Sequence, residues 1–219
     1  MKKSKIFEVY EDRGRFFTKN KVPGQQVYDE ILRKDKGEEF REWNPYRSKI
    51  CSALKKGTQN IFIRNDSIIL YLGASTGTTV SHLSDMLTNG FIFAVDLAPR
   101  VLRDLYFLAE TRTNIAPILA DASKPESYIE RISAVDIIFQ DIAQKNQVEI
   151  FLKNINSFLV SNGYAIIAVK ARSIDVTAQP KKIFNQVKAQ LEESLTIIDT
   201  KDLSPFQKDH ILYICKKKD

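Results

Sequence analysis

Several polar side chains stand directly after short apolar runs, where a parallel sheet would gather its functional groups. Three of them are the carboxylates Asp96, Asp121 and Asp141, and the fourth is Lys170. Because the carboxyl ends of parallel strands meet at one edge of a sheet, we expect these groups to converge on one ligand crevice. A carboxylate accepts hydrogen bonds from hydroxyl or amino groups, and a lysine amine moves a proton or stabilises a developing negative charge. The pattern therefore predicts a site for a polar ligand at this edge of the sheet.

Each of these residues also has a purely structural explanation. Asp96 could cap a helix that begins at Pro99, and Asp121 fits a turn at the end of a strand. Lys170 could be a surface lysine whose stem lies along apolar side chains. It ends the run A-I-I-A-V-K, from which we expect a partly buried stem and an amine that faces the crevice. Four polar groups at one edge favour the functional interpretation over these separate explanations.

The stretch I-I-L-Y-L-G-A-S-T-G-T-T, residues 68–79, predicts a buried strand, a glycine loop and the start of a helix. Gly73 and Ala74 open the loop, where the backbone can approach a ligand closely. The pattern G-x-x-x-G matches neither the dinucleotide fingerprint G-x-G-x-x-G nor the phosphate loop G-x-x-x-x-G-K-[ST]. It is similar to the looser glycine loop of S-adenosylmethionine (AdoMet) methyltransferases, although a tight strand-to-helix turn explains it equally well. Asp96 follows Gly73 by 23 residues, the place of a carboxylate that accepts ribose hydroxyls.

The composition is that of an ordinary globular protein with an excess of positive charge. The chain has 219 residues, of which 43% are hydrophobic and 27% charged, and its formal net charge is +6. The charge favours an acidic partner such as nucleic acid, although general solubility explains it as well. Cys51 and Cys215 lack C-x-x-C spacing, so we expect reduced, buried cysteines in a cytoplasmic protein. No signal peptide and no apolar run of about 20 residues is recognisable, and no membrane partner is expected.

Strands and helices alternate from residue 68 onward. The expected strands cover residues 68–72, 91–95, 115–119, 135–139 and 164–169, and the expected helices cover 77–88, 99–112, 124–132, 145–159 and 180–191. This alternation predicts a doubly wound, mainly parallel sheet. Two further strands, 195–198 and 210–214, are joined by a connection too short for a parallel crossover, so they should be antiparallel.

Residues 1–42 are expected to form a small β-rich region and a connection, packed on a main domain of residues 43–219. Turn residues at 11–14 lie between apolar and aromatic runs and predict a hairpin. The highly charged residues 29–42 predict an exposed connection, and residues 43–46 should lead into a helix over 47–56. His82 is interpreted as a structural or surface residue.

Six stretches together resemble the fibrillarin family in its archaeal form, the RNA 2′-O-methyltransferases of box C/D guide ribonucleoproteins. They are W-N-P-Y-R-S-K (43–49), Y-L-G-A-S-T-G-T-T-V-S-H (71–82), R-T-N-I-A-P-I-L-A-D-A (112–122), D-I-I-F-Q-D-I-A-Q (136–144), D-V-T-A-Q-P (175–180) and D-H (209–210). They extend over most of the chain from about residue 41. The resemblance implies a class I AdoMet-dependent methyltransferase fold, with a Rossmann-like, seven-stranded, mainly parallel sheet that ends in an antiparallel hairpin.

The resemblance also implies which residues form the site. AdoMet is the implied cofactor, and its contacts fall on Thr78, Thr79, Asp96, Leu97, Asp121, Ala122, Asp141, Ile142, Ala143 and Gln144, besides Gly73 and Ala74 of the loop. The implied catalytic set is Lys49, Asp141 and Lys170, with His210 in a fourth position and no metal. Two departures stand out: Asp96-Leu97 replaces a glutamate and an aromatic residue, and G-A-S-T-G replaces G-A-A-S-G. The shorter acid should still reach the ribose, while stacking on adenine should be weaker.

A ribose 2′-hydroxyl is a poor nucleophile near neutral pH, so the protein must align it and help to remove its proton. Our hypothesis is that Lys170 orients and deprotonates this hydroxyl, with Asp141 fixing the lysine. The alternative is that its charged amine stabilises the developing alkoxide.

The implied partners are a box C/D guide RNA and target RNA, a Nop-family scaffold protein and a kink-turn-binding ribosomal-type protein. The implied targets are rRNA and, as a second class, tRNA. Two rival functions are a catalytically silent RNA-binding or assembly subunit and a nicotinamide-dependent oxidoreductase. The intact strand-end residues argue against the first, and the missing third glycine and the terminal hairpin argue against the second.

Overall fold

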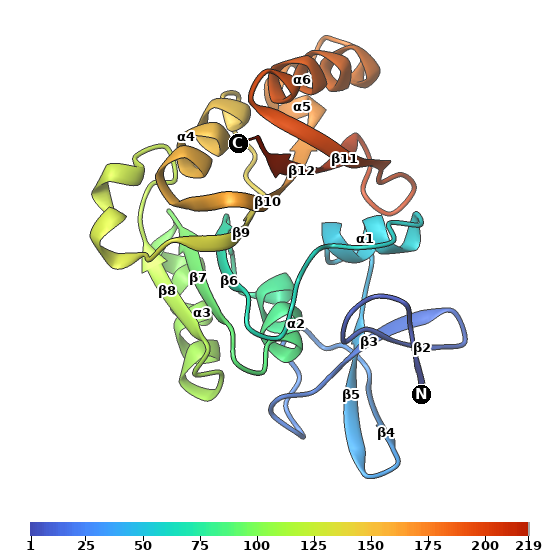
Figure 1. Ribbon diagram of the computed structural model, residues 1–219. Helices are drawn as coiled ribbons and strands as arrows, with labels where there is room; N and C mark the ends of the chain where they lie inside the picture. Colours follow the sequence, from blue (N-terminus) through green and yellow to red (C-terminus); the bar gives the residue numbers. More distant parts are fainter. Residues whose placement is uncertain (219) are drawn as a thin grey trace.

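A seven-stranded sheet forms the centre of the computed structural model, which describes residues 1–218 (Figure 1). The order of its strands is β11-β12-β10-β9-β6-β7-β8. The strands are β6 (Ile68–Leu72), β7 (Phe91–Asp96), β8 (Ile115–Leu119), β9 (Val135–Gln140), β10 (Leu159–Lys170), β11 (Leu195–Asp202) and β12 (His210–Lys217). The helices are α1 (Lys49–Lys55), α2 (Thr78–Met86), α3 (Pro99–Thr111), α4 (Gln147–Phe158), α5 (Ala171–Ile174) and α6 (Pro180–Ser194).

The directions of the strands confirm the predicted sheet. Strands β6 to β10 pair in parallel, whereas β12 is antiparallel to both β10 and β11. Since five strands are parallel, their carboxyl ends open on one edge, and the first residue of β12 lies at that edge beside the last residue of β10. None of the helices within residues 1–218 is long and apolar enough to cross a membrane.

Alternating side chains of the central strands build two apolar cores, one on each face of the sheet. One core joins residues such as Tyr71 of β6 to α1, α2 and α3, and it includes Leu54, Leu83 and Leu105. The other joins residues such as Leu72 to α4 and α6. Because both faces are covered, the strands read as continuous apolar runs rather than alternating ones.

The N-terminal residues form a second sheet, and here one expectation is wrong. Its strands are β1 (Lys2–Lys3), β2 (Tyr10–Asp12), β3 (Arg15–Lys19), β4 (Leu32–Asp35) and β5 (Glu38–Trp43), in the order β1-β2-β3-β5-β4. The hairpin at residues 11–14 is confirmed, but residues 29–42 are no exposed connection, because β4 and β5 pair within them. The prediction took charged residues to be exposed, whereas Arg41 is fully buried and its Nε donates to Glu30 at 2.5 Å. The proposed boundary between residues 42 and 43 stays a prediction.

A buried polar network holds the N-terminal sheet against α2. Arg41 and Arg112 both form ion pairs with Asp85, at 2.9 Å and 2.5 Å. His82 is fully buried, 2.7 Å from the hydroxyls of both Thr18 and Tyr28. Burial lowers the pKa of the His82 imidazole well below its usual value, and the two arginines lower it further. His82 is therefore a neutral structural residue that fixes the helix leading out of the glycine loop.

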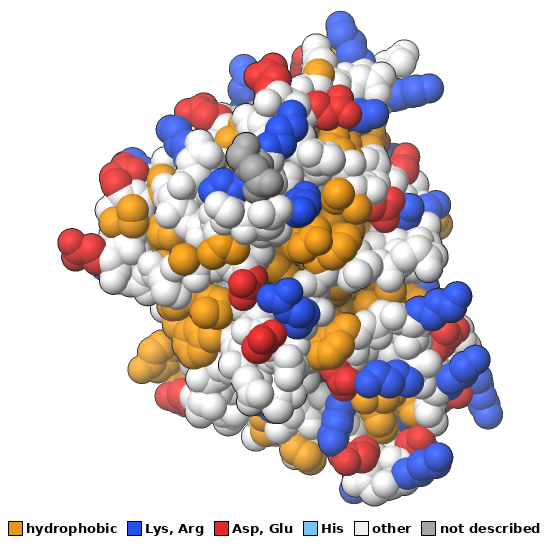
Figure 2. All heavy atoms as spheres, in the orientation of Figure 1, with side chains coloured by type: hydrophobic (Ala, Val, Ile, Leu, Met, Phe, Trp, Pro, Cys, Tyr) orange, Lys and Arg blue, Asp and Glu red, His pale blue; other side chains and the backbone are white. Residues whose placement is uncertain are grey.

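Two further details of the main domain differ from expectation. Residues 124–132 form two short 3-10 turns, η1 (Pro125–Ser127) and η2 (Ile129–Arg131), instead of one helix. Residues 160–163, which separate the expected helix 145–159 from the expected strand 164–169, lie inside β10, where the register against β9 shifts and Asn162 takes a φ of 62°. On the face shown in Figure 2, Lys and Arg side chains are interspersed with Asp and Glu over the N-terminal sheet and near α6.

Candidate active site

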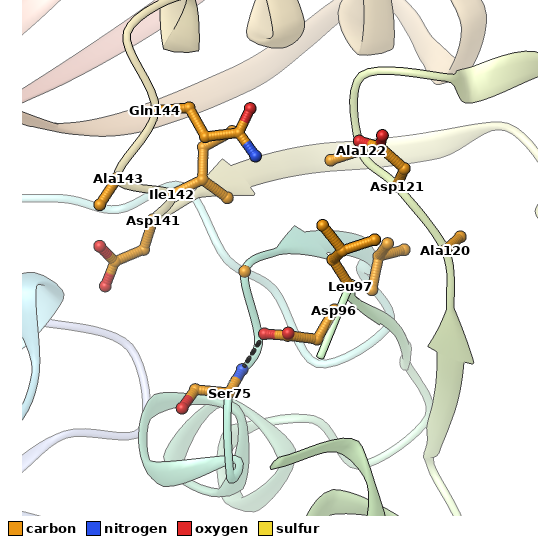
Figure 3. A pocket seen from close by; sticks show the side chains of 12 residues that line it. Ser75, Asp96, Leu97, Ala120, Asp121, Ala122, Asp141, Ile142, Ala143 and Gln144 are labelled. Carbon is orange, nitrogen blue, oxygen red and sulfur yellow. Dashed lines mark hydrogen bonds between the residues drawn. The ribbon is translucent and has the colours of Figure 1, made fainter. Parts of the chain in front are cut away.

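A cavity of about 310 Å³ opens at the carboxyl edge of the parallel strands (Figure 3). Its walls come from the loops that follow β6, β7, β8 and β9. The lining residues are Gly73, Ser75, Val95, Asp96, Leu97, Ala120, Asp121, Ala122, Asp141, Ile142, Ala143 and Gln144. Four loops thus converge as the topology requires, and their polar groups face a pocket of the size that small organic ligands occupy.

Gly73 allows the glycine loop to pass close to the neighbouring strand end. Its φ is 81°, and a Cβ atom here would run into the backbone carbonyl of Asp141 and the side chain of Ile142. The Gly73 and Ala74 N–H groups both donate to the carbonyl of Val95, at 2.9 Å and 3.1 Å. The loop is therefore held against β7 and β9, and only glycine satisfies both the conformation and the space.

Asp96 at the end of β7 accepts hydrogen bonds from two backbone segments, but the N-cap residue of α3 is Ala98, and the contact of Asp96 with ribose stays a prediction. Its Oδ1 accepts a hydrogen bond from the N–H of Ala98 at 2.9 Å, just before α3. Its Oδ2 accepts from the N–H of Ser75 at 2.7 Å, which fixes the carboxylate against the glycine loop (Figure 3). A carboxylate has about four acceptor positions, so acceptor capacity remains for a ligand in the cavity that Asp96 lines.

The other side of the cavity combines a second carboxylate with apolar walls. Asp121 accepts a hydrogen bond from the N–H of Ser123 at 2.9 Å, and hydrogen bonds from Ser123 hold the pKa of its carboxyl below the usual value. Leu97, Ala122 and Ile142 provide apolar surface around it (Figure 3). A flat base between these side chains and a ribose near Asp96 fit this arrangement, so the residues present are suited to a nucleoside cofactor such as AdoMet.

The cavity contains most, but not all, of the positions expected for the cofactor. Ala74, Thr78 and Thr79 are not among the lining residues, and their contacts with AdoMet stay predictions. Thr79 is buried and donates to the Ser48 hydroxyl at 3.0 Å, which joins α2 to the start of α1. The sequence interpretation missed Ser75, Val95 and Ala120, which line the cavity. Their positions beside Gly73, Asp96 and Asp121 were the available signal.

Glutamine side chains that the sequence interpretation missed support the loop after β9. Gln140 and Gln147 are fully buried. Gln140 Nε2 donates to the carbonyl of Gln147 at 2.6 Å, and Gln147 Nε2 donates to the carbonyl of Gln144 at 2.8 Å. These two hydrogen bonds thus hold the loop 141–144, which lines the cavity, against the start of α4.

Lys49 and Asp141 form the contact between the cavity and the expected catalytic residues. Lys49 is the first residue of α1, which the Ser48 side chain caps by accepting from the N–H of Cys51. Its Nζ lies 2.9 Å from Asp141 Oδ2, and both side chains are about a quarter exposed or less. Asp141 follows β9 and also lines the cavity. The Asp141 carboxylate thus both lines the cavity and contacts an expected catalytic residue, Lys49.

Lys170 and His210 lie opposite one another in the ladder between β10 and β12. Lys170 as a whole residue is exposed, and the expected partial burial of its stem stays a prediction. It is the last residue of β10 and the N-cap residue of α5, which begins at Ala171. Asp141 was expected to fix Lys170, but it forms its ion pair with Lys49 instead.

His210 is partly buried and neutral. Its Nδ1 lies 2.7 Å from the carbonyl of Lys208; because a carbonyl only accepts, Nδ1 carries the proton and Nε2 is left as an acceptor. Burial lowers the pKa of the His210 imidazole, the contact with Lys208 opposes this, and the charges of Lys49 and Lys170 lower it further while Asp141 raises it. Lys49, Asp141 and Lys170 therefore all lie within electrostatic reach of His210.

Comparisons with known proteins agree with this geometry. The sequence model of the fibrillarin family matches residues 1–219. A fibrillarin-like rRNA/tRNA 2′-O-methyltransferase of Thermococcus sibiricus is 46% identical over 215 residues, which cover 97% of this chain and 95% of that protein.

Two solved structures are similarly close. Aeropyrum pernix fibrillarin with natively bound S-adenosyl-L-methionine has a TM-score of 0.85 and 44% identity, covering 92% of this chain and 88% of that one. A fibrillarin from a fibrillarin/Nop5p complex has a TM-score of 0.90 and 40% identity, covering 97% and 99%. With a family match over its whole length and such relatives, the chain belongs to the fibrillarin family.

Proposed function

We propose that this protein transfers the methyl group of AdoMet to ribose 2′-hydroxyls of rRNA and tRNA, as the catalytic subunit of a box C/D ribonucleoprotein. We call Lys49, Asp141, Lys170 and His210 the catalytic cluster. The observation that carries the proposal is the position of Asp141, which lines the nucleoside-sized cavity and forms an ion pair with Lys49. A cofactor in the cavity and a hydroxyl beside the cluster would meet at this carboxylate. The relatives named as 2′-O-methyltransferases support the same reaction.

The proposed cofactor site uses groups already held in place. Asp96 would accept the ribose hydroxyls, Asp121 would face the adenine amino group, and Leu97 and Ile142 would cover the base. When bound, AdoMet supplies a methyl group that its sulfonium already activates. The chain must therefore orient the hydroxyl, exclude water and manage one proton.

The catalytic cluster offers two ways to manage that proton. Lys170 is exposed at the sheet edge, so an RNA strand arriving from solvent meets its amine first. A free lysine is mostly protonated near neutral pH, and in that form it would hold the hydroxyl and stabilise the developing alkoxide. The unprotonated amine would take the proton directly. His210 Nε2 is a neutral acceptor in the same cluster, and the Lys49–Asp141 pair keeps the surrounding charge balanced.

We assign target selection to partners rather than to this chain. The sequence contains no recognisable RNA-reading motif such as the aromatic motif of an RRM sheet or a KH glycine loop. On the face shown in Figure 2, basic side chains alternate with acidic ones. A related fibrillarin was solved in a complex with Nop5p, which supports a Nop-family scaffold. Guide RNA and a kink-turn-binding ribosomal-type protein complete the proposed complex, which is expected to be cytoplasmic.

Two measurements test the proposal. Calorimetric titration with AdoMet, NAD and ATP should show binding of AdoMet alone. Methylation of a target RNA should be slow and unselective with the isolated protein and site-selective with the assembled complex. Binding of NAD alone would contradict the cofactor assignment. An assembled complex that binds AdoMet but leaves the 2′-hydroxyl unmethylated would make the chain a silent assembly subunit.

A further inference from the structure

Two loops that lead directly into catalytic positions are fastened to each other. Residues 44–48 precede Lys49, and residues 203–209 join β11 to β12 and precede His210. Gln207 Nε2 bridges them, donating to the carbonyls of Pro45 at 3.1 Å and Tyr46 at 2.9 Å. The bridge explains how helix α1 and strand β12, far apart in sequence, are kept in a fixed relation at one edge of the site.

The two loops together present an aromatic surface. The rings of Tyr46 and Phe206 lie 5.3 Å apart at 75°, in an edge-to-face arrangement. Tyr46 is 61% exposed, so burial in this chain does not account for its aromatic ring. We call this pair the aromatic wall.

Basic side chains lie in the same segments. Lys208 is exposed in the loop that carries Phe206, and Lys170 is exposed opposite His210. Arg172 forms an ion pair with Asp209 at 3.3 Å, beside His210, and remains 45% exposed. An aromatic surface with cations around it suits a nucleic-acid strand, because rings pack against bases and sugars while cations meet phosphates.

We propose that the aromatic wall of Tyr46 and Phe206 is the surface against which the target RNA strand packs next to the reacting ribose. This inference rests on the proposed function and deepens it. Stacking on aromatic rings tolerates every base, so the wall would place any nucleotide, and the choice of nucleotide would remain with the guide. Packing on the wall would restrict the strand to positions in which the 2′-hydroxyl faces Lys170. Tyr46 and Phe206 are thus positioning residues rather than catalytic ones.

The test uses the assembled ribonucleoprotein with a guide and a matching target, at saturating AdoMet and target. Under these conditions the target RNA is bound through base pairing with the guide. The methylation rate then reports how often the target strand lies with its 2′-hydroxyl at the catalytic residues. Tyr46→Ala and Phe206→Ala should each lower the single-turnover methylation rate by about 5- to 100-fold, the range expected from the loss of one aromatic stacking contact. Tyr46→Phe should keep the wild-type rate because it keeps the ring. AdoMet affinity and complex assembly should not change in any of these variants.

A matched control and a direct readout separate placement from structural damage. Tyr106 on α3 is 60% exposed, so Tyr106→Ala removes an equally exposed ring from a different element and should leave the rate unchanged. A 4-thiouridine next to the target nucleotide should cross-link to residues 44–48 or 203–209 of the wild-type protein. Wild-type rates in both alanine variants, or cross-links confined to other segments of an active complex, would overturn this inference. If the wild-type complex itself transfers no methyl group, the proposed function fails instead.

Discussion

Lys49 Nζ and Asp141 Oδ2 lie 2.9 Å apart, and Asp141 also lines the cavity. This pair divides the expected catalytic set into two parts. Lys49 and Asp141 are partly buried and neutralise each other, whereas Lys170 and His210 face one another at the open end of β10 and β12. The charges of Lys49 and Asp141 therefore balance each other, and Lys170, the residue proposed to act on the substrate, has no ion pair with Asp141.

Breaking this ion pair should lower the rate of methyl transfer more than the stability of the fold. Asp141→Asn keeps the size of the side chain but removes the charge that offsets Lys49, so a partly buried cation would stand beside the reaction. We expect the single-turnover methylation rate to fall by at least about 100-fold, the low end of the loss for a displaced proton-handling group. Glu149→Gln is the control, because it removes the partner of an exposed ion pair with Lys153 on α4, which contributes little. Equal rates in the two variants would refute the role given to Asp141.

Gly73→Ala should damage the cavity specifically. The added methyl group meets the carbonyl of Asp141 and the side chain of Ile142, in a backbone conformation with φ of 81°. Gly37→Ala places the same methyl group at a φ of 84° with nothing within 4 Å, so it carries the conformational strain without the collision. AdoMet affinity, measured by calorimetry, should fall strongly in the first variant and stay unchanged in the second. Equal affinities would show that the cofactor does not use this loop.

Asp96→Ala should lower both AdoMet affinity and thermal stability. The lost charge-assisted hydrogen bonds to ribose correspond to about 1.5–3 kcal/mol, or roughly 10- to 100-fold in Kd. Stability should fall because the N–H groups of Ser75 and Ala98 lose their acceptor. Asp96→Asn keeps one acceptor oxygen and should recover more of the stability than of the affinity. If only the melting temperature responds, Asp96 is a cap and not a ligand of the cofactor.

The two histidines should make the fold less stable in mild acid. The pKa values of His82 and His210 are lowered in the folded protein, so below about pH 6.5 the unfolded chain binds protons that the native state does not. Stability should therefore fall as the pH decreases from about 6.5. His82→Gln removes one of the two groups and should reduce the slope by up to about 1.4 kcal/mol per pH unit. Urea unfolding between pH 5 and 8 gives that slope, and an unchanged slope in the variant would contradict this account.

The main sheet was predictable because its signals are local. Apolar runs that end in Asp96 and Asp141, with helical spacing between them, define parallel strands and place those residues at one edge. The antiparallel hairpin of β11 and β12 followed from the length of its connection, and the structure confirms it.

Other features depend on tertiary contacts that no local pattern contains. The charges of residues 29–42 suggested an exposed connection. No residue of this stretch indicates that Arg41 will be buried against Asp85 of α2. The partners of Asp141 and Lys49 were likewise not readable, since an ion pair depends on where α1 packs. The bridge from Gln207 to Pro45 joins segments more than 150 residues apart.

The most direct test of the central claim is the rate of methyl transfer after substitution of Lys170. Single-turnover methylation is measured with the complex preassembled and AdoMet saturating, and with Lys181→Ala on α6 as an exposed-lysine control. Lys170→Ala should leave AdoMet affinity nearly intact and lower the rate by about 10²–10⁴-fold. Lys170→Arg keeps the charge but is no base near neutral pH, so it should be nearly as inactive as Ala if proton abstraction is essential and should retain much of the rate if charge stabilisation dominates. A wild-type rate for Lys170→Ala would contradict the account.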